Sequence, residues 1–231
     1  MTQQLILDIL PPSPQTLDNF IAGENGPALD ALRHCKPGRA VYLWGPSGAG
    51  RSHLLRAVSN GDDAAYFSAS HDTAGLDRIA KADVIRHRLL AIDDIESLDA
   101  PGQASLFTLY NRWRESASGK QAFILVVAGD RAPMATPLRE DLRTRLGWDL
   151  AFRLHLLSDN DRARALHMRA QGRGLKLAPE VINWLLVHYT RDMGHLGALV
   201  DALDRYSLER HRPITLPLLK ELLASSQANT D

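Results

Sequence analysis

One glycine-rich segment limits the fold of this chain more than any other feature. Residues 45–52 read GPSGAGRS, directly after the apolar run RAVYLW and directly before the helical pattern SHLLRAVSN. A strand, a glycine-rich turn and a helix in this order form a phosphate loop, in which backbone N–H groups surround phosphate oxygens. An ordinary glycine-rich strand-to-helix turn shares part of the pattern, but the agreement of all three parts favours a nucleotide site.

The loop departs from the usual pattern at one position, because Arg51 stands where a lysine is common. A guanidinium keeps the positive charge but is larger and planar, so we expect nucleotide binding to tolerate the exchange better than the geometry of hydrolysis does. Ser52 is the expected Mg²⁺ ligand. The candidate nucleotide-binding residues of this segment are Gly45, Pro46, Ser47, Gly48, Ala49, Gly50, Arg51, Ser52 and His53. Helix packing also explains His53.

Two further strand ends carry carboxylates. The apolar run LLAI is followed by Asp93 and Asp94, about 40 residues after the loop. Such a pair alone often caps a helix, but together with a phosphate loop it predicts a Walker B strand. Asp93 would then hold Mg²⁺ and Asp94 would orient or activate the attacking water. The next strand, FILVVAG, ends at Asp130, where ATPases of this architecture place a sensor of the γ-phosphate.

Short strands alternate with helical stretches up to a fifth strand candidate, AFRLHLL. This alternation predicts a parallel α/β sheet flanked by helices. After Ser158 only helical patterns follow, which predicts a separate helical subdomain. We therefore expect an extended tail at residues 1–15, an α/β domain at 16–157 and a helical lid subdomain at 158–231.

Composition excludes several classes of protein. The chain has 27 Lys+Arg and 27 Asp+Glu in 231 residues, so it lacks the basic excess of a free-standing DNA-binding module. Its single cysteine, Cys35, excludes an internal disulfide bond and is typical of a reducing compartment. The sequence contains no apolar run of membrane-spanning length, and its start does not read as a secretory signal. We expect a cytoplasmic protein.

In combination these motifs resemble the AAA+ family and, within it, the DnaA-like proteins. The resemblance extends over residues 4–223, where the following segments occur in the family's order: TLDNFIAGENGPAL, GAGRSHLL, LYNRWRES, AGDRAP, DLRTRLGW and RDMGHLGALVDALDRYS. It implies a five-stranded AAA+ sheet with a C-terminal lid. It also implies that Phe20 and Ile21, in the segment before the first strand, line the adenine pocket.

The segment DLRTRL contains two arginines, Arg143 and Arg145, before the fifth strand. Their spacing alone is explained by a solvated helix end. The resemblance implies that Arg145 is an arginine finger, which enters the nucleotide site of a neighbouring molecule, with Arg143 as a second candidate. The position of the lid's sensor arginine holds Gly194, three residues after Arg191. This departure implies that hydrolysis by the chain itself is weak or absent.

The tail contains a candidate docking peptide, QLILDI at residues 4–9. It resembles the peptide that bacterial proteins insert into the hydrophobic groove of the sliding clamp, the beta subunit of DNA polymerase III. Leu5, Leu7 and Ile9 would fill pockets while Gln4 sets the register. Alternating runs of this kind also occur in edge strands. The candidate clamp-binding residues are Gln4, Leu5, Leu7, Asp8 and Ile9.

The resemblance implies a regulator of replication initiation that binds ADP or ATP with Mg²⁺. With the DNA-loaded clamp it would stimulate hydrolysis of DnaA-bound ATP through Arg145, and so inactivate the initiator. Its partners would be DnaA and the clamp, and both a homo-oligomer and indirect contact with DNA are compatible with this role. One alternative is a self-sufficient ATPase of the loader or remodelling type, whose turnover would depend on Asp94. Another is a truncated initiator that binds DNA directly.

Overall fold

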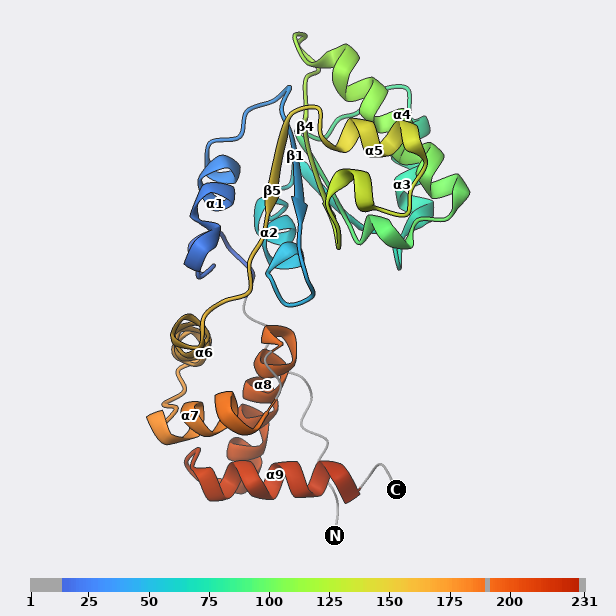
Figure 1. Ribbon diagram of the computed structural model, residues 1–231. Helices are drawn as coiled ribbons and strands as arrows, with labels where there is room; N and C mark the ends of the chain where they lie inside the picture. Colours follow the sequence, from blue (N-terminus) through green and yellow to red (C-terminus); the bar gives the residue numbers. More distant parts are fainter. Residues whose placement is uncertain (1–13, 190–191, 229–231) are drawn as a thin grey trace. The chain divides into compact units, whose positions relative to one another are not determined.

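The computed structural model describes residues 14–189 and 192–228. Within these ranges the chain separates into two compact units that meet in sequence between Asp161 and Arg162. The first is an α/β domain and the second is a helical domain (Figure 1). None of the helices in the described ranges is long and apolar enough to cross a membrane.

The α/β domain contains the predicted five-stranded sheet. Its strands are β1 (Ala40–Trp44), β2 (Ala64–Ser68), β3 (Leu89–Asp93), β4 (Ile124–Gly129) and β5 (Leu150–Arg153). All neighbouring pairs are parallel, in the order β2-β3-β4-β1-β5. The helices are α1 (Gly26–Arg33), α2 (Arg51–Val58), α3 (Thr73–Lys81), α4 (Ala100–Ser116) and α5 (Glu140–Leu146), with short 3-10 turns at Gly23–Asn25, Ile95–Ser97 and Pro133–Ala135. The fold class predicted from the sequence is confirmed.

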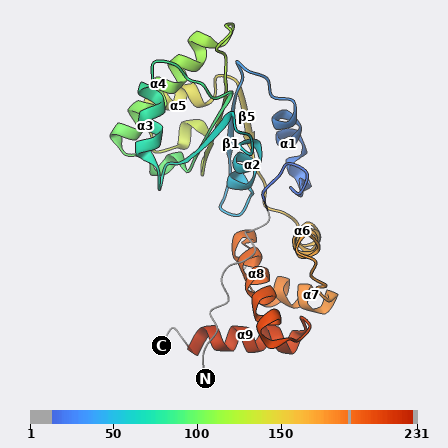
Figure 2. The same cartoon turned by 180° about the vertical axis from the view of Figure 1, so that it is seen from behind.

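Helices cover both faces of the sheet because successive strand residues point to opposite sides. In β1, Tyr42 packs in a core shared with α3, α4 and α5, whereas Val41 and Leu43 pack in a second core with α1 and α2. Figures 1 and 2 show these two helix layers on either side of the strands. The sheet is therefore buried on both faces, as its continuous apolar strands require.

The carboxyl ends of the central strands lie at one edge of the sheet. Trp44, the last residue of β1, is in register with Gly129 at the end of β4, and Asp93 at the end of β3 is in register with Ser68. The segment 45–52 therefore begins at the same edge at which β3 and β4 present their terminal acidic residues. In open parallel sheets this edge is where ligands bind.

At the opposite edge, Asp149 ties the start of β5 to the start of β1. Its carboxylate accepts hydrogen bonds from Arg39 Nε at 2.7 Å and from the Ala40 N–H at 2.9 Å. Burial alone would raise the pKa of Asp149, but these bonds and the charge of Arg39 hold it below its ordinary value of 3.8. The contact fixes the turn that follows α5.

We expect Asp149→Asn to lower the free energy of unfolding at pH 7 by about 1–2 kcal/mol, since one charged hydrogen-bond acceptor is lost from a pair whose arginine is half exposed. The lowered pKa means that this stabilisation is complete above the unfolded-state value and is lost as the pH falls through the lower folded-state value. Denaturant titrations at pH 7 and below pH 3.8 test this, and the difference between variant and wild type should shrink in acid. Asp18→Asn, at an exposed pair with Arg33, is the control and should change little.

The helical domain packs four helices around its own core. They are α6 (Asp159–Gly172), α7 (Pro179–His188), α8 (Met193–Arg210) and α9 (Leu216–Ala228). Ser158 Oγ accepts a hydrogen bond from the Asp161 N–H at the start of α6, and Asp192 does the same for the His195 N–H at the start of α8. Leu166, Leu185 and Val200 are fully buried between the helices.

Two acidic residues of α8 join it to α6 and to Arg173, the residue that directly follows α6. Asp201 contacts Arg169 at 2.7 Å and Arg173 at 3.0 Å, and Asp204 contacts Arg173 at 3.4 Å. Arg173 and Asp204 are nearly buried, so each needs the other's charge. This ion-pair network orients α8, the helix that carries Gly194.

Candidate functional site

The segment 45–52 leads into the start of α2, and its backbone conformation requires glycine at two positions. Gly50 is the N-cap of α2 and has φ +96°, a left-handed conformation. A Cβ built on Gly50 would lie 2.6 Å from Phe20 Cε2, and one on Gly45 would lie 2.5 Å from the Leu154 carbonyl oxygen. The loop is thus packed against the chain on two sides, with its N–H groups at the helix N-terminus, where anions bind favourably.

The segment before the first strand lies beside this loop. The rings of Phe20 and His53 are 5.3 Å apart, and His53 Nε2 is 3.0 Å from the Thr16 carbonyl oxygen. His53 thus has a packing role that also places it next to Phe20. Ile21 is half-buried. The two predicted base-pocket residues therefore come from a segment that is held at the loop.

We expect Gly50→Ala to destabilise the protein by about 2 kcal/mol and to weaken nucleotide binding at least about tenfold, because an L side chain at this φ is strained and would collide with Phe20. Gly26→Ala is a matched control, since Gly26 starts α1 with φ −48° and an added Cβ meets nothing within 4 Å. Thermal melting and nucleotide titration of both variants check this. Equal nucleotide affinity in Gly50→Ala and wild type would contradict the expectation.

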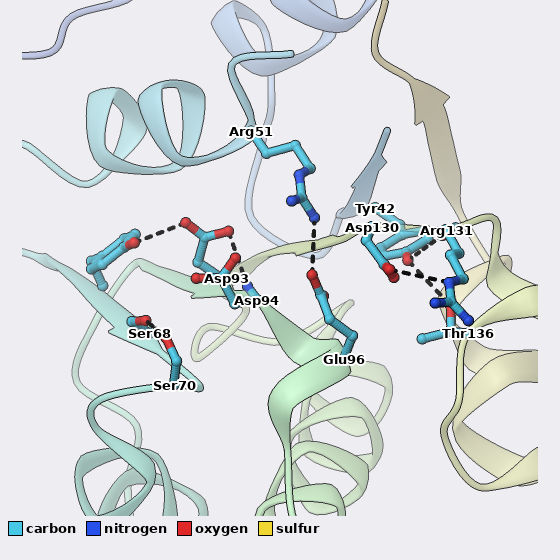
Figure 3. A network of polar contacts seen from close by, with 11 residues as sticks. Tyr42, Arg51, Ser68, Ser70, Asp93, Asp94, Glu96, Asp130, Arg131 and Thr136 are labelled. Carbon is cyan, nitrogen blue, oxygen red and sulfur yellow. Dashed lines mark hydrogen bonds and ion pairs between the residues drawn. The ribbon is translucent and has the colours of Figure 1, made fainter. Parts of the chain in front are cut away.

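Arg51 is held by a carboxylate that the sequence analysis did not single out. Its Nη1 lies 3.3 Å from Glu96 Oε1, and both side chains are largely buried, at 11% and 21% exposure. Figure 3 shows the Arg51 side chain pointing toward Glu96. Glu96 belongs to the 3-10 turn Ile95–Ser97, directly after the β3 acidic pair. The only signal for Glu96 in the sequence was its position three residues after Asp93.

The two carboxylates after β3 differ in environment. Asp93 is completely buried, and its Oδ2 accepts a hydrogen bond from Tyr66 Oη at 2.8 Å while its Oδ1 accepts one from the Asp94 N–H. Asp94 has a left-handed backbone with φ 55°. Burial, reinforced by the charge of Asp93, raises the pKa of Asp94, and Arg51 opposes that rise. The strained backbone and the raised pKa are features that cluster at functional sites.

A pocket of about 390 Å³ lies between the start of α2 and the end of β2. Its lining consists of Ser52, Arg56, Tyr66, Ser68, His71, Asp72 and Asp94. Ser52 and Asp94 therefore face the same space, and Tyr66 connects that space to Asp93. Hydroxyl and carboxylate oxygens are the donors that Mg²⁺ prefers, so the residues present at this edge fit the ion.

Asp130 lies at the end of β4, beside Tyr42. Asp130 Oδ2 accepts a hydrogen bond from Arg131 Nε at 3.1 Å, while its Oδ1 is buried and has no hydrogen-bond partner among the described residues. Tyr42 Oη donates to the Arg131 carbonyl oxygen at 2.6 Å, and burial raises the pKa of Tyr42 to about 12. These contacts fix the turn after β4 next to the loop (Figure 3).

Arg145 does not join this group. It lies in the last turn of α5, which leads to the start of β5, whereas the loop follows the end of β1. Its Nη1 donates to Asn111 Oδ1, and its guanidinium lies 3.7 Å from the Phe107 ring centroid and 4.8 Å from that of Trp148. Burial lowers the pKa of Arg145 below its ordinary value. Sequence spacing carried no signal for these partners.

The structure thus places the predicted site residues in two groups, with Gly194 apart from both. Those at the carboxyl edge of the sheet are Phe20, Ile21, Gly45, Pro46, Ser47, Gly48, Ala49, Gly50, Arg51, Ser52, His53, Asp93, Asp94 and Asp130. Arg145 lies apart from them on α5, where Arg143 Nη1 contacts the Met134 carbonyl oxygen at 3.5 Å. The predicted clamp peptide, Gln4 to Ile9, lies outside the described residues, as does Arg191. Gly194 is exposed in the first turn of α8.

Comparison with known proteins gives matches both in sequence and in structure. Residues 159–223 match the family model described as the lid domain of Hda. The chain is similar to domain III of the replication initiation protein DnaA from Thermotoga maritima, with a TM-score of 0.76 and 21% identity over 94% of this chain and 98% of that one. DnaA from Aquifex aeolicus, solved with bound AMPPCP, gives a TM-score of 0.64 and 23% identity over 87% of this chain and 68% of that one.

The RuvB branch migration motor of Thermotoga maritima is also similar, with a TM-score of 0.66 and 17% identity over 92% of this chain and 72% of that one. At these identities the solved structures establish a shared fold. That fold is the AAA+ architecture, with a parallel five-stranded sheet followed by a helical lid. The helical domain described above is the part that matches the Hda lid.

Proposed function

We propose that this chain, a DnaA-like AAA+ protein with the lid domain of Hda, is a regulator of replication initiation that acts on DnaA. It binds ADP at the loop of residues 45–52 and is brought to DNA by the sliding clamp. There it docks on ATP-bound DnaA and supplies Arg145 to the partner's nucleotide site. Hydrolysis of the partner's ATP then inactivates the initiator.

The placement of Arg145 carries this proposal. An arginine finger that acts in trans must stay out of its own molecule's nucleotide site and be available to a neighbour's. Arg145 meets the first condition, because its contacts are Asn111, Phe107 and Trp148 on the α4–α5 side of the domain. Trp148 is 39% exposed, so this cluster reaches the surface. If the Arg145 guanidinium gave up its hydrogen bond to Asn111 and donated to a phosphate oxygen instead, it would contact the partner's ATP.

The nucleotide part of the proposal is supported by the loop and its surroundings. Left-handed Gly50, the α2 N-terminus and Arg51 form an anion site, and Phe20 stands beside it for the base. Ser52 and Asp93 would hold Mg²⁺, and Asp94 would orient water. DnaA of the same fold has been solved with the ATP analogue AMPPCP. Bound Mg²⁺ supplies charge neutralisation of the phosphates.

Two features favour ADP binding over turnover by this chain itself. Arg51, the cation of the loop, is already engaged by Glu96. The lid position expected for a sensor arginine is Gly194, which has no side chain to reach a phosphate. We therefore assign the chain the role of activator of a partner's hydrolysis. A self-sufficient ATPase would instead show turnover alone and lose it in Asp94→Ala.

The deciding experiment measures the fate of DnaA-bound ATP in the presence of DNA-loaded clamp, ADP and this chain, with each component omitted in turn. We expect rapid loss of DnaA-bound ATP only in the complete mixture. The same assay without DnaA should show little hydrolysis. Unchanged DnaA-bound ATP in the complete mixture would refute the proposed function.

A further inference from the structure

The positive charge of the phosphate loop is paired within the protein. Arg51 is the only lysine or arginine in residues 45–52. Its Nη1 lies 3.3 Å from Glu96 Oε1, and the two side chains are only 11% and 21% exposed. An ion pair with so little contact with water is poorly screened. The cation that a phosphate loop offers to its ligand is therefore shared with a carboxylate from the turn after β3.

The second oxygen of Glu96 has no such partner. Glu96 Oε2 is buried and makes no hydrogen bond with any residue in the described part of the chain. It lies over Gly129, where an added Cβ would be 3.5 Å from it. A buried carboxylate oxygen left in this state keeps its full negative field toward nearby groups. Glu96 thus contributes negative charge where the loop, β3 and β4 converge.

Two further carboxylates, Asp94 and Asp130, follow the ends of β3 and β4 near this ion pair. The charge of Arg51 acts on Asp94, and Glu96 and Asp130 both act on the hydroxyl of Tyr42. Asp130 has its own cation, Arg131, at 3.1 Å. Arg51 is thus the counter-charge of both Asp94 and Glu96, which reduces its capacity to bind further anions.

We propose that Glu96 is a specificity-determining residue, which makes the loop prefer a nucleoside diphosphate to a nucleoside triphosphate. The inference rests on the proposed nucleotide site. A triphosphate brings one more phosphoryl group, and therefore more negative charge, to a loop whose cation is already paired. Like charges placed close together in a partly buried site weaken binding. The carboxylate of Glu96 therefore opposes ATP more than it opposes ADP.

Removal of this charge should change the two affinities unequally. In Glu96→Gln the side chain keeps its size, while Arg51 becomes free to face phosphate oxygens. We expect ADP to bind somewhat more tightly and ATP to gain more, so that the ratio of the ATP to the ADP dissociation constant falls roughly tenfold. Glu96→Ala should shift the ratio in the same direction, because it removes the same charge.

Isothermal titration of the full chain with Mg·ADP and with Mg·ATP measures both constants, and circular dichroism verifies that the variants fold. The matched control is Glu115→Gln, an exposed glutamate of α4, which should leave the ratio unchanged. The proposal also requires that the wild-type protein bind ADP more tightly than ATP. This measurement does not depend on whether any variant folds. Equal affinities in the wild type, or an unchanged ratio in folded Glu96→Gln, overturn the role of Glu96 and leave the nucleotide site intact. Binding of neither nucleotide to the wild type overturns the nucleotide site itself.

Discussion

Arg145→Ala should abolish the stimulation of DnaA-bound ATP hydrolysis while leaving the chain folded and bound to the clamp. An arginine finger stabilises charge that develops on the transferred phosphoryl group, and its loss lowers the rate of other NTPases by about 10³–10⁵-fold. The remaining stimulation should therefore be undetectable in an assay that follows DnaA-bound ATP with time. The substitution removes contacts with Asn111 and Phe107 on a half-buried surface, so we expect at most about 1–2 kcal/mol of destabilisation.

Arg143→Ala is the matched control for this result. It lies two residues earlier on α5 and contacts the Met134 carbonyl oxygen rather than Asn111. Stimulation should persist in Arg143→Ala if Arg145 alone acts on the partner's ATP. Arg145→Lys adds a second comparison, because it keeps a charge but cannot reproduce the planar guanidinium. Wild-type stimulation by Arg145→Ala would show that the finger is a different residue.

The second large effect concerns the clamp. Simultaneous Leu5→Ala and Leu7→Ala substitution should remove detectable binding to the sliding clamp. Burial of each leucine side chain in a groove contributes about 1.5–3 kcal/mol, so loss of both weakens binding by roughly a hundredfold or more. Surface plasmon resonance with immobilised clamp measures this directly. Added clamp should then no longer increase the hydrolysis of DnaA-bound ATP, because the variant does not bind the clamp.

Ile6→Ala separates a groove peptide from a general apolar contact. In an extended peptide, alternate side chains point to opposite sides, so Ile6 would face away from the pockets that Leu5 and Leu7 are proposed to fill. Its replacement should leave clamp affinity within a few-fold of wild type. Equal losses of clamp affinity in Ile6→Ala and in the double variant would indicate a nonspecific apolar contact instead of a peptide bound in one register. Unchanged binding by the double variant would rule out the tail as the clamp-binding segment.

Much of the α/β architecture was predictable because its signals are local. Apolar runs such as LLAI and FILVVAG mark buried parallel strands, and GPSGAGRS fixes the connection between a strand and α2. Helix α3 was not predicted, since it is nine residues long and is marked mainly by its cap, Asp72, which accepts a hydrogen bond from the Gly75 N–H. Glu96 was missed for another reason: its partner lies 45 positions away.

The sequence by itself determined the loop at residues 45–52, the acidic strand ends and the helical lid. Each depends on backbone preferences and hydrophobic periodicity within about 10–20 neighbouring residues. Only the tertiary structure decided which side chains contact one another. The order β2-β3-β4-β1-β5 brings the turn after β3 to the loop after β1, which pairs Arg51 with Glu96. The packing of α5 on α4 puts Arg145 beside Asn111 and away from that loop. Distances between side chains depend on strand order and helix packing, which no local pattern encodes.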